Sequence, residues 1–432
     1  MNDLLTTLLQ RLDEPAARYA ELDRYYSGTQ PLSFLAPEAK TALGSRFGRM
    51  ASNLPRLAVT ALAERLRVVG FTRDGRPDED LWADWVANDL DQTSGVAHRE
   101  ALTLGRAYVI VWGDEAGGPR VSVESARQVA TLVDPGSRRV LAAVKRWETA
   151  TTTEAVLFEA DQVTRLRAQS TGATTAGFRT VEVLENPLGR PPVVALTNSD
   201  RLLDEHGTSE ITDLAPLVDG LNKTLADMLV GSEYYARPRR WATGVELEED
   251  DTGEATNPFP EDHRMMVAEE SDAKFGSLPA ADLGAYEAAV KVLLGQVMAV
   301  SALPGHYLGV MTAEPPSADS LRAAEASLTA RAEARQATFG RSWEDVGRLM
   351  VAVRSGVDPD SVTVRVKWAD PATRSVAQEA DAVVKLHAAG LLPASVALAR
   401  LGYTDDEIAA IRDARRAEAL DGAGLNLTEL LP

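Results

Sequence analysis

Leucines and tyrosines recur at helical spacing through residues 1–26, and Pro15 interrupts them. Because proline removes a backbone donor and clashes with the preceding turn, this pattern predicts either one kinked helix or two short helices. Asn53 is a suitable N-cap for a second helix, whose apolar face is expected to continue until Gly70. The chain therefore opens with helical structure.

A run of β-branched and aromatic residues at 107–112 is typical of a buried strand. Short helices are expected just before it, at 81–90 and 98–105. From this strand to about residue 198 the sequence alternates strand and turn patterns. The further strands are expected at 121–123, 129–133, 140–147, 155–159, 162–168 and 181–184. Together they predict an α+β module of meandering strands.

The second half of the chain is dominated by helical patterns. Helices are expected at 209–236 and 282–301, and a very long one at 318–354, for which Ser317 is a plausible N-cap. The long helix would measure about 55 Å at a rise of 1.5 Å per residue. Its stripe comprises Leu321, Ala324, Leu328, Ala332, Arg335, Phe339, Val346 and Met350. A half-buried strand at 362–368 and three short helices at 376–389, 393–401 and 405–420 complete the chain.

The charge of the chain is unevenly distributed. With 64 acidic and 45 basic residues, the formal net charge is −19, which argues against tight, general binding of nucleic acid. Between Gly244 and Asp272, eleven acidic residues face a single base, Arg264. The carboxylates of this insertion could hold divalent cations, but their spacing matches no calcium loop, and a solvated acidic loop is the simpler interpretation.

The sequence lacks the motifs of most catalytic sites. It contains no cysteine and no Gly-Lys pair, so thiolate metal sites and the phosphate-binding loop of a translocating motor are excluded. Its five histidines are widely separated, which favours surface or packing roles over metal binding. The longest apolar stretch, 288–303, is interrupted by Lys291 and Gln296 and is too short to span a bilayer. We therefore expect neither enzymatic activity, nor a metal or cofactor, nor a membrane association.

Two further segments have open interpretations. Residues 237–240 form a compact basic cluster, for which a helix-end or salt-bridge role is more plausible than a nucleic-acid patch. Residues 303–316 contain too much proline and glycine for regular structure. The apolar members of this loop either pack against the neighbouring helices or meet DNA or neighbouring subunits.

Several short strings, taken in order, give the chain a resemblance to a known family. They are 25–32, 53–59, 65–71, 188–194, 207–211, 219–222, 318–325 with Phe339 and Trp343, 366–371, 380–382 and 385–386. Their order and spacing over nearly the whole chain resemble the portal proteins of tailed bacteriophages, of the siphophage type. The rival interpretations are a head-tail adaptor or other minor head protein, and a metal-dependent nuclease that uses the acidic insertion.

The resemblance implies a division of the chain into named parts. These are an α/β wing (1–207 and, with the long helix, 317–375), paired stem helices (208–236 and 282–302), a small α/β clip (237–281), a tunnel loop (303–316) and an α-helical crown (376–432). The fold class is therefore expected to be α+β, with copies of the chain forming a ring.

The resemblance also implies a function and partners. Such proteins form a dodecamer at one capsid vertex, through which double-stranded DNA is packaged and ejected. The large terminase, head-completion or adaptor proteins, and the major capsid and scaffolding proteins are the expected partners. Assembly would occur in the host bacterial cytoplasm, and the ring would then reside in the virion.

The residues expected at functional surfaces fall into two groups. Those expected near DNA are Lys291, Pro304, His306, Tyr307, Leu308, Val310 and Met311. Those expected to dock partners are Arg239, Arg240, Glu246, Glu248, Glu249, Asp250, Asp251 and Glu254. A negative channel lining would repel phosphates and let DNA slide, so the acidic balance fits this role. Whether the clip acids line the exit or meet a basic partner stays open at this point.

Overall fold

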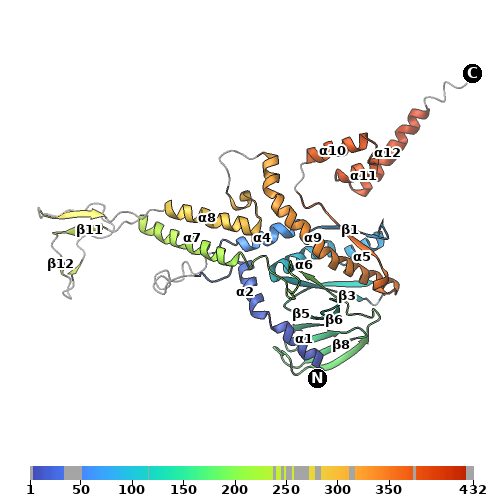
Figure 1. The fold of residues 1–432 in the computed structure, drawn as a ribbon, viewed down its shortest axis with the longest axis horizontal. Helices are drawn as coiled ribbons and strands as arrows, with labels where there is room; N and C mark the ends of the chain where they lie inside the picture. Colours follow the sequence, from blue (N-terminus) through green and yellow to red (C-terminus); the bar gives the residue numbers. More distant parts are fainter. Residues whose placement is uncertain are drawn as a thin grey trace, which may run out of the picture. The chain divides into compact units, whose positions relative to one another are not determined.

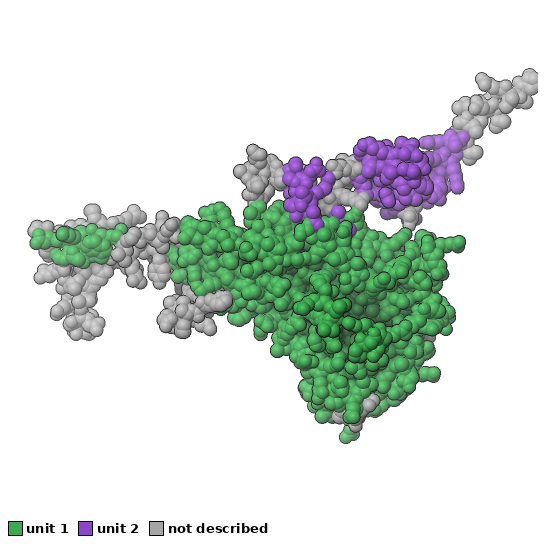
Figure 2. Space-filling model, viewed as in Figure 1, with its two compact units in different colours: residues 1–310, 327–370 green, residues 311–326, 371–432 purple. Residues whose placement is uncertain are grey.

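A computed structural model describes most of the chain, which divides into two compact units (Figure 2). Unit 1 comprises residues 1–310 and 327–370, and unit 2 comprises residues 311–326 and 371–432. The described residues are 3–33, 51–114, 116–236, 240–244, 248–249, 255–256, 272–277, 284–310, 317–372 and 376–424. Helices and strands are both abundant in unit 1, which confirms the mixed fold class (Figure 1).

The N-terminal segment forms two short helices, α1 (Asp3–Asp13) and α2 (Ala16–Ser27), separated at Pro15. The alternative of two helices is thus confirmed. The next helix, α4 (Leu54–Ala63), begins after Asn53 as predicted, but the Asn53 side chain makes no capping hydrogen bond because its backbone is left-handed, with φ 48°. The expected end at Gly70 is wrong, since the helix ends at Ala63 and Gly70 lies in a strand.

Helices α5 (Glu79–Ala87) and α6 (Leu90–Leu104) follow. Asp78 caps α5, accepting a 3.2 Å hydrogen bond from the backbone N–H of Leu81. The predicted start of the second helix at residue 98 was eight residues late. Residues 91–95 include no apolar side chain, so the helical spacing of apolar residues cannot be recognised there, although Leu90 is fully buried.

Two antiparallel sheets form the centre of unit 1. The three-stranded sheet has the order β10-β3-β4, with β3 (Arg106–Gly113) in the middle, β4 (Pro119–Ser125) on one side and β10 (Val193–Thr197) on the other. The five-stranded sheet has the order β5-β6-β7-β8-β9. Its strands are Val129–Val133, Val140–Glu148, Thr153–Phe158, Gln162–Ala168 and Arg179–Glu185. Each strand pairs with its sequence neighbour, so the predicted meander is confirmed, whereas β10 was not foreseen.

Helix α1 packs on the five-stranded sheet. Its four buried leucines are Leu5, Leu8, Leu9 and Leu12, and they form a separate hydrophobic cluster with Val144 and Leu157 of the sheet. Burying four leucines gives each a transfer free energy of roughly 1.5–3 kcal/mol, which is enough to fix so short a helix.

The long helix α9 (Ala318–Ser355) has 38 residues and confirms the prediction. At its start, Ser317 Oγ accepts a 3.2 Å hydrogen bond from the Ser320 backbone, as expected of an N-cap. The helix is followed by the 3-10 turn η2 (Pro359–Ser361) and by strand β15 (Val364–Trp368). Strand β15 pairs with β1 (Val68–Arg73), which also pairs with the two-residue β2 (Arg76–Pro77).

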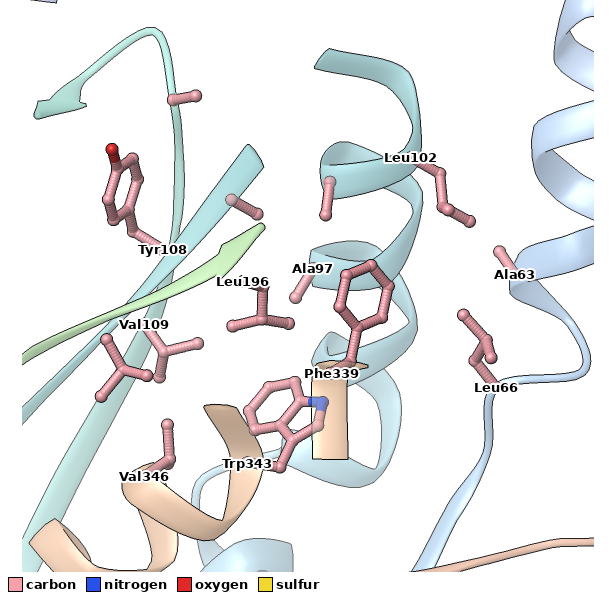
Figure 3. Packing of buried hydrophobic residues seen from close by; sticks show 14 of the residues in the cluster. Ala63, Leu66, Ala97, Leu102, Tyr108, Val109, Leu196, Phe339, Trp343 and Val346 are labelled. Atoms are coloured by element: carbon pink, nitrogen blue, oxygen red, sulfur yellow. The ribbon is translucent and has the colours of Figure 1, made fainter. Parts of the chain in front are cut away.

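The main hydrophobic core joins α9 to α6 and to the three-stranded sheet (Figure 3). Phe339, Trp343 and Val346 of α9 are completely buried there. The rings of Trp85 and Trp343 meet edge to face, with centroids 4.9 Å apart and an interplanar angle of 74°. Aromatic pairs in this geometry contribute about 0.5–1.5 kcal/mol beyond area burial.

The helices of unit 2 are α10 (Val376–Ala388), α11 (Ala394–Arg400) and α12 (Asp405–Gly424), as the sequence predicts. Val383, Ala397 and Ile408 are the buried hydrophobic residues among the described positions of these three helices. Thr404 and Glu407 form a capping box, in which Glu407 Oε2 accepts a 2.8 Å hydrogen bond from the Thr404 backbone.

Among the described helices, none combines the length and the apolar character that crossing a bilayer requires.

Candidate functional site: the α7–α8 helix pair and the segments at its ends

Helices α7 (Ala215–Ala236) and α8 (Gly284–Ser301) lie side by side (Figure 1). Gly220 of α7 faces α8, because a Cβ atom there would lie at an ordinary van der Waals distance of 3.7 Å from Leu293 Cδ2. The predicted start of α7 at residue 209 is wrong by six residues. Ser209 Oγ instead accepts a 3.0 Å hydrogen bond from the Ile211 N–H, which favours the turns found at 210–214.

The first turns of α7 are anchored to the N-terminal segment. Asp219 Oδ2 accepts two hydrogen bonds of 2.8 Å, from the Tyr25 hydroxyl and from Ser33 Oγ. Asn222 Oδ1 accepts a third, at 3.0 Å, from the Ser52 backbone. Burial and the hydrogen bond to Asp219 raise the pKa of Tyr25, so the hydroxyl remains a donor at neutral pH. The helix pair therefore has a fixed base on the body of unit 1.

A largely buried charge cluster links this base to α9. Arg335 is 9% exposed and lies 3.0 Å from Glu210 Oε1, and it also pairs with Asp200. Arg331 donates a 2.9 Å hydrogen bond to the Val300 carbonyl in the last turn of α8. The hydrogen bond from Arg335 holds the pKa of the Asp200 carboxyl below its usual range.

Sequence reasoning did not identify this cluster. A signal was present, because Arg335 occupies a position in the α9 stripe whose other members are mostly apolar. An arginine on the buried face of a helix requires acidic partners, since an unpaired buried charge is costly.

The acidic insertion joins the far ends of the two helices. Its described residues are strands: β11 (Arg240–Thr243) pairs with β14 (Lys274–Ser277), and β12 (Glu248–Glu249) with β13 (Ala255–Thr256). Gly276 is needed opposite Trp241, because a Cβ atom there would lie 2.5 Å from the indole ring. The structure therefore brings Arg240, Glu248 and Glu249 onto β strands. The other predicted docking residues, Arg239, Glu246, Asp250, Asp251 and Glu254, lie outside the described residues.

The loop after α8 contains a short 3-10 turn, η1 (Gly305–Leu308), although no regular structure was expected there. The turn closes through a 3.0 Å hydrogen bond from the Val310 N–H to the Gly305 carbonyl. Pro304 is buried, and Tyr307 and Leu308 are half-buried against the main core. His306 and Val310 are exposed, and Met311 lies outside the described residues.

Lys291, the remaining predicted channel residue, lies on α8. Its Nζ pairs with Glu287 Oε1 one turn away at 2.7 Å, and both side chains are about 70% exposed. The pair is therefore close to neutral and worth little to stability. In the described part of the chain, no three histidine, aspartate or glutamate side chains gather as a metal site would require.

These features define a mixed α/β protein in which a helix pair holds an acidic β insertion at its far end. The family described as "Phage portal protein, SPP1 Gp6-like" matches residues 5–420, so the chain belongs to the phage portal protein family. The resemblance noted in the sequence is thereby confirmed.

Two relatives from mycobacteriophages agree with this assignment. The chain is 31% identical over 395 residues to the portal protein of Mycobacterium phage D29, covering 86% of this chain and 80% of that relative. It is 30% identical to the portal protein of Mycobacterium phage L5, with the same coverage. Among solved structures, chains of a native gene transfer agent virion and of the neck of an empty gene transfer agent particle are similar at 14% identity. Their TM-scores are 0.46 and 0.49, and each match covers 89% of this chain and 93% or 94% of the other.

Proposed function

We propose that copies of this chain form a ring at one vertex of a phage capsid, and that double-stranded DNA enters and leaves through its central channel. The observation that supports this most directly is the match to the portal family over residues 5–420. The similarity to curated portal proteins extends over 80% of their length, which favours a portal over a shorter head-tail adaptor.

Within this ring, α7 and α8 would be the stem and the insertion at 237–281 the clip. The loop at 303–316 would be the tunnel loop, and the helices of 376–432 the crown. The rest of unit 1, including most of α9, would be the wing. The base of α7 supports the stem assignment, because Asp219 and Asn222 fix that helix to the body of unit 1.

The acidic insertion would meet either DNA or a protein partner at the end of the channel. Its eleven acids and one base give each subunit a local excess of ten negative charges, which a ring would multiply. A surface of this charge repels DNA phosphates and attracts basic protein surfaces. We assign it to docking of the large terminase during packaging and of head-completion or adaptor proteins afterwards. The ring would be assembled with capsid and scaffolding proteins in the host cytoplasm.

Ring formation is tested by negative-stain microscopy and mass photometry of the purified full-length chain. The expected result is a closed ring with a central hole, of about twelve times the 46.4 kDa chain mass. A species that stays monomeric at high concentration would overturn the proposal.

The docking role is tested by neutralising four adjacent acids, Glu248→Gln, Glu249→Gln, Asp250→Asn and Asp251→Asn. Binding of terminase and of completion proteins to assembled rings should weaken. A matched control neutralises four exposed acids of the body, Glu64, Asp74, Asp161 and Glu185. Equal binding by the two variants would show that the insertion acids do not dock partners.

A further inference from the structure

Two adjacent leucines project from the loop that connects β10 to α7. Leu202 and Leu203 are 82% and 89% exposed, more than any other large hydrophobic side chain in the described residues. They are followed by Asp204 and Glu205, so the loop presents an apolar tip with acids beside it. Exposed apolar side chains placed together mark an interaction surface more often than isolated ones do.

This loop is held in place rather than frayed. Asp200 pairs with the buried Arg335, and Arg138 donates a 2.9 Å hydrogen bond to the Leu202 carbonyl. Thr208 Oγ1 donates a 2.8 Å hydrogen bond to Asp204 Oδ2. The two leucines are therefore presented to solvent by a fixed backbone, which lowers the entropic cost of binding.

The same chain has a cavity, here called the α6 hollow, whose size and partly apolar lining suit the two leucine side chains. A cavity of about 810 Å³ is lined by residues of α2 and α6, by the end of β6 and by the turn between β4 and β5. Tyr26, Val96, Leu104 and Trp147 give its lining apolar surface, and Val96 is 48% exposed. Its volume lies within the range of binding pockets for drug-sized molecules, which is ample for two leucine side chains.

One arginine of the hollow has no ion pair in the described part of the chain. Three arginines and three carboxylates (Asp23, Glu100 and Glu148) line the hollow, and Arg127 pairs with Asp23 at 3.4 Å while Arg146 pairs with Asp13. No carboxylate among the described residues pairs with the third, Arg99. Glu205 is 72% exposed and pairs with the 39% exposed Arg11 at 3.8 Å. An exposed ion pair of this length is worth little, so Glu205 can exchange Arg11 for an arginine of another molecule at small cost.

The loop and the hollow lie at opposite ends of the β5–β6 hairpin. Arg138, in the hairpin turn, binds the leucine loop, whereas Gln128, Arg146 and Trp147, at the open end, line the hollow. Five residues of strand separate the two ends by about 16 Å. Complementary surfaces at two different places on one subunit produce head-to-tail contacts, which close into rings when the rotation per subunit allows.

We infer that Leu202 and Leu203 of one copy insert into the α6 hollow of the next copy, with Glu205 facing Arg99. This inference rests on the proposed ring and deepens it, because it names the contact between neighbouring subunits. The leucines would contribute the buried apolar area, and the charge pair would set the direction of docking.

Disulfide crosslinking in assembled rings tests the contact, since the chain has no cysteine of its own. The double variant Leu203→Cys with Val96→Cys should give a ladder of covalent oligomers beyond the dimer after oxidation. Each single variant can give dimers at most. A matched control combines Val96→Cys with Val183→Cys, whose native valine is 55% exposed on strand β9, and should give no ladder.

The outcomes separate this inference from the proposed function. Rings that are visible by microscopy but give no ladder would overturn the inference and leave the portal function standing. Absence of any ring from the unmodified chain would overturn the portal proposal itself and the inference with it.

Two further variants test the chemistry of the contact. Leu202→Asp with Leu203→Asp should weaken association of subunits by roughly tenfold or more in mass photometry. Thermal unfolding should be unchanged, because both leucines are exposed in the single chain. Arg99→Glu should also weaken association, and combining it with Glu205→Arg should restore it. Failure of this charge exchange to restore association would exclude the Arg99–Glu205 pairing.

Discussion

Nε1 of Trp343 donates a 2.8 Å hydrogen bond to Nε2 of His98, although 245 positions separate the two residues in sequence. Both side chains are completely buried, and the His98 imidazole also stacks on Phe339, with an interplanar angle of 2°. An imidazole can accept this hydrogen bond only when Nε2 is unprotonated. The core that joins α6 to α9 therefore requires a neutral histidine.

The stability of unit 1 should consequently depend on pH. Burial lowers the pKa of His98 from 6.5 to about 3. Between these values the unfolded chain binds a proton that the folded chain does not, so the free energy of unfolding falls as the pH falls. We expect a loss of up to about 1.4 kcal/mol per pH unit below pH 6.5, measured by denaturant unfolding between pH 7 and pH 5.

The variant His98→Gln separates this contribution from those of the carboxylates. Glutamine keeps a hydrogen-bond acceptor for Trp343 but does not titrate, so the slope of stability against pH should become shallower. Identical slopes for His98→Gln and the unmodified chain would contradict the assignment.

Local signals in the sequence were sufficient for most elements of the fold. Pro15 separated α1 from α2, Ser317 marked the start of α9, and alternating apolar residues located the strands of the meander. Each of these signals acts within a few residues, so one sequence contains all the information needed.

Other failures occurred where distant residues decide the structure. Val68–Arg73 forms a strand only because it pairs with Val364–Trp368, nearly three hundred positions later. Likewise, the sequence indicated which residues form the loop around η1. It could not show that Tyr307 and Leu308 pack on the core, because that packing depends on tertiary contacts. The partners of Arg335, which come from residues 200 and 210, were hidden for the same reason.

Gly207 should tolerate no side chain. It has φ 71°, and a Cβ atom there would lie 2.0 Å from the Gly105 carbonyl oxygen. Gly207→Ala should therefore lower the free energy of unfolding by roughly 3 kcal/mol or more. The matched control is Gly172→Ala, which has φ 72° but nothing within 4 Å, and should cost only about 1 kcal/mol. The free energy of unfolding of both variants is measured by denaturant unfolding. Equal losses would show that the backbone moves easily enough to relieve the clash with the Gly105 carbonyl.

Removing one partner of the Arg335 cluster should be strongly destabilising. Arg335→Met leaves Glu210, which is 11% exposed, with Arg331 at 3.3 Å as its remaining cation, so we expect a loss of about 2–3 kcal/mol. Adding Glu210→Gln to this variant should cost less than the sum of the two single changes, because the Arg335–Glu210 interaction is already lost. Arg322→Met, which breaks an ion pair with the 84% exposed Asp319, is the control and should cost less than about 1 kcal/mol. Additive losses for the double variant would argue against a coupled cluster.

The residues of the loop after α8 differ in burial. Tyr307 and Leu308 pack on the core, so Leu308→Ala should loosen the turn and lower stability by about 1–2 kcal/mol. His306 and Val310 are exposed, and replacing both with alanine should leave ring formation unchanged. If the loop meets DNA as we propose, the exposed pair alone should reduce the amount of DNA packaged or retained per particle, measured in phage complemented with the variant. Leu391→Ala, at a site 70% exposed in unit 2, should package normally. Normal DNA content with the His306→Ala, Val310→Ala variant would mean that the turn serves only to fix α8 to the core.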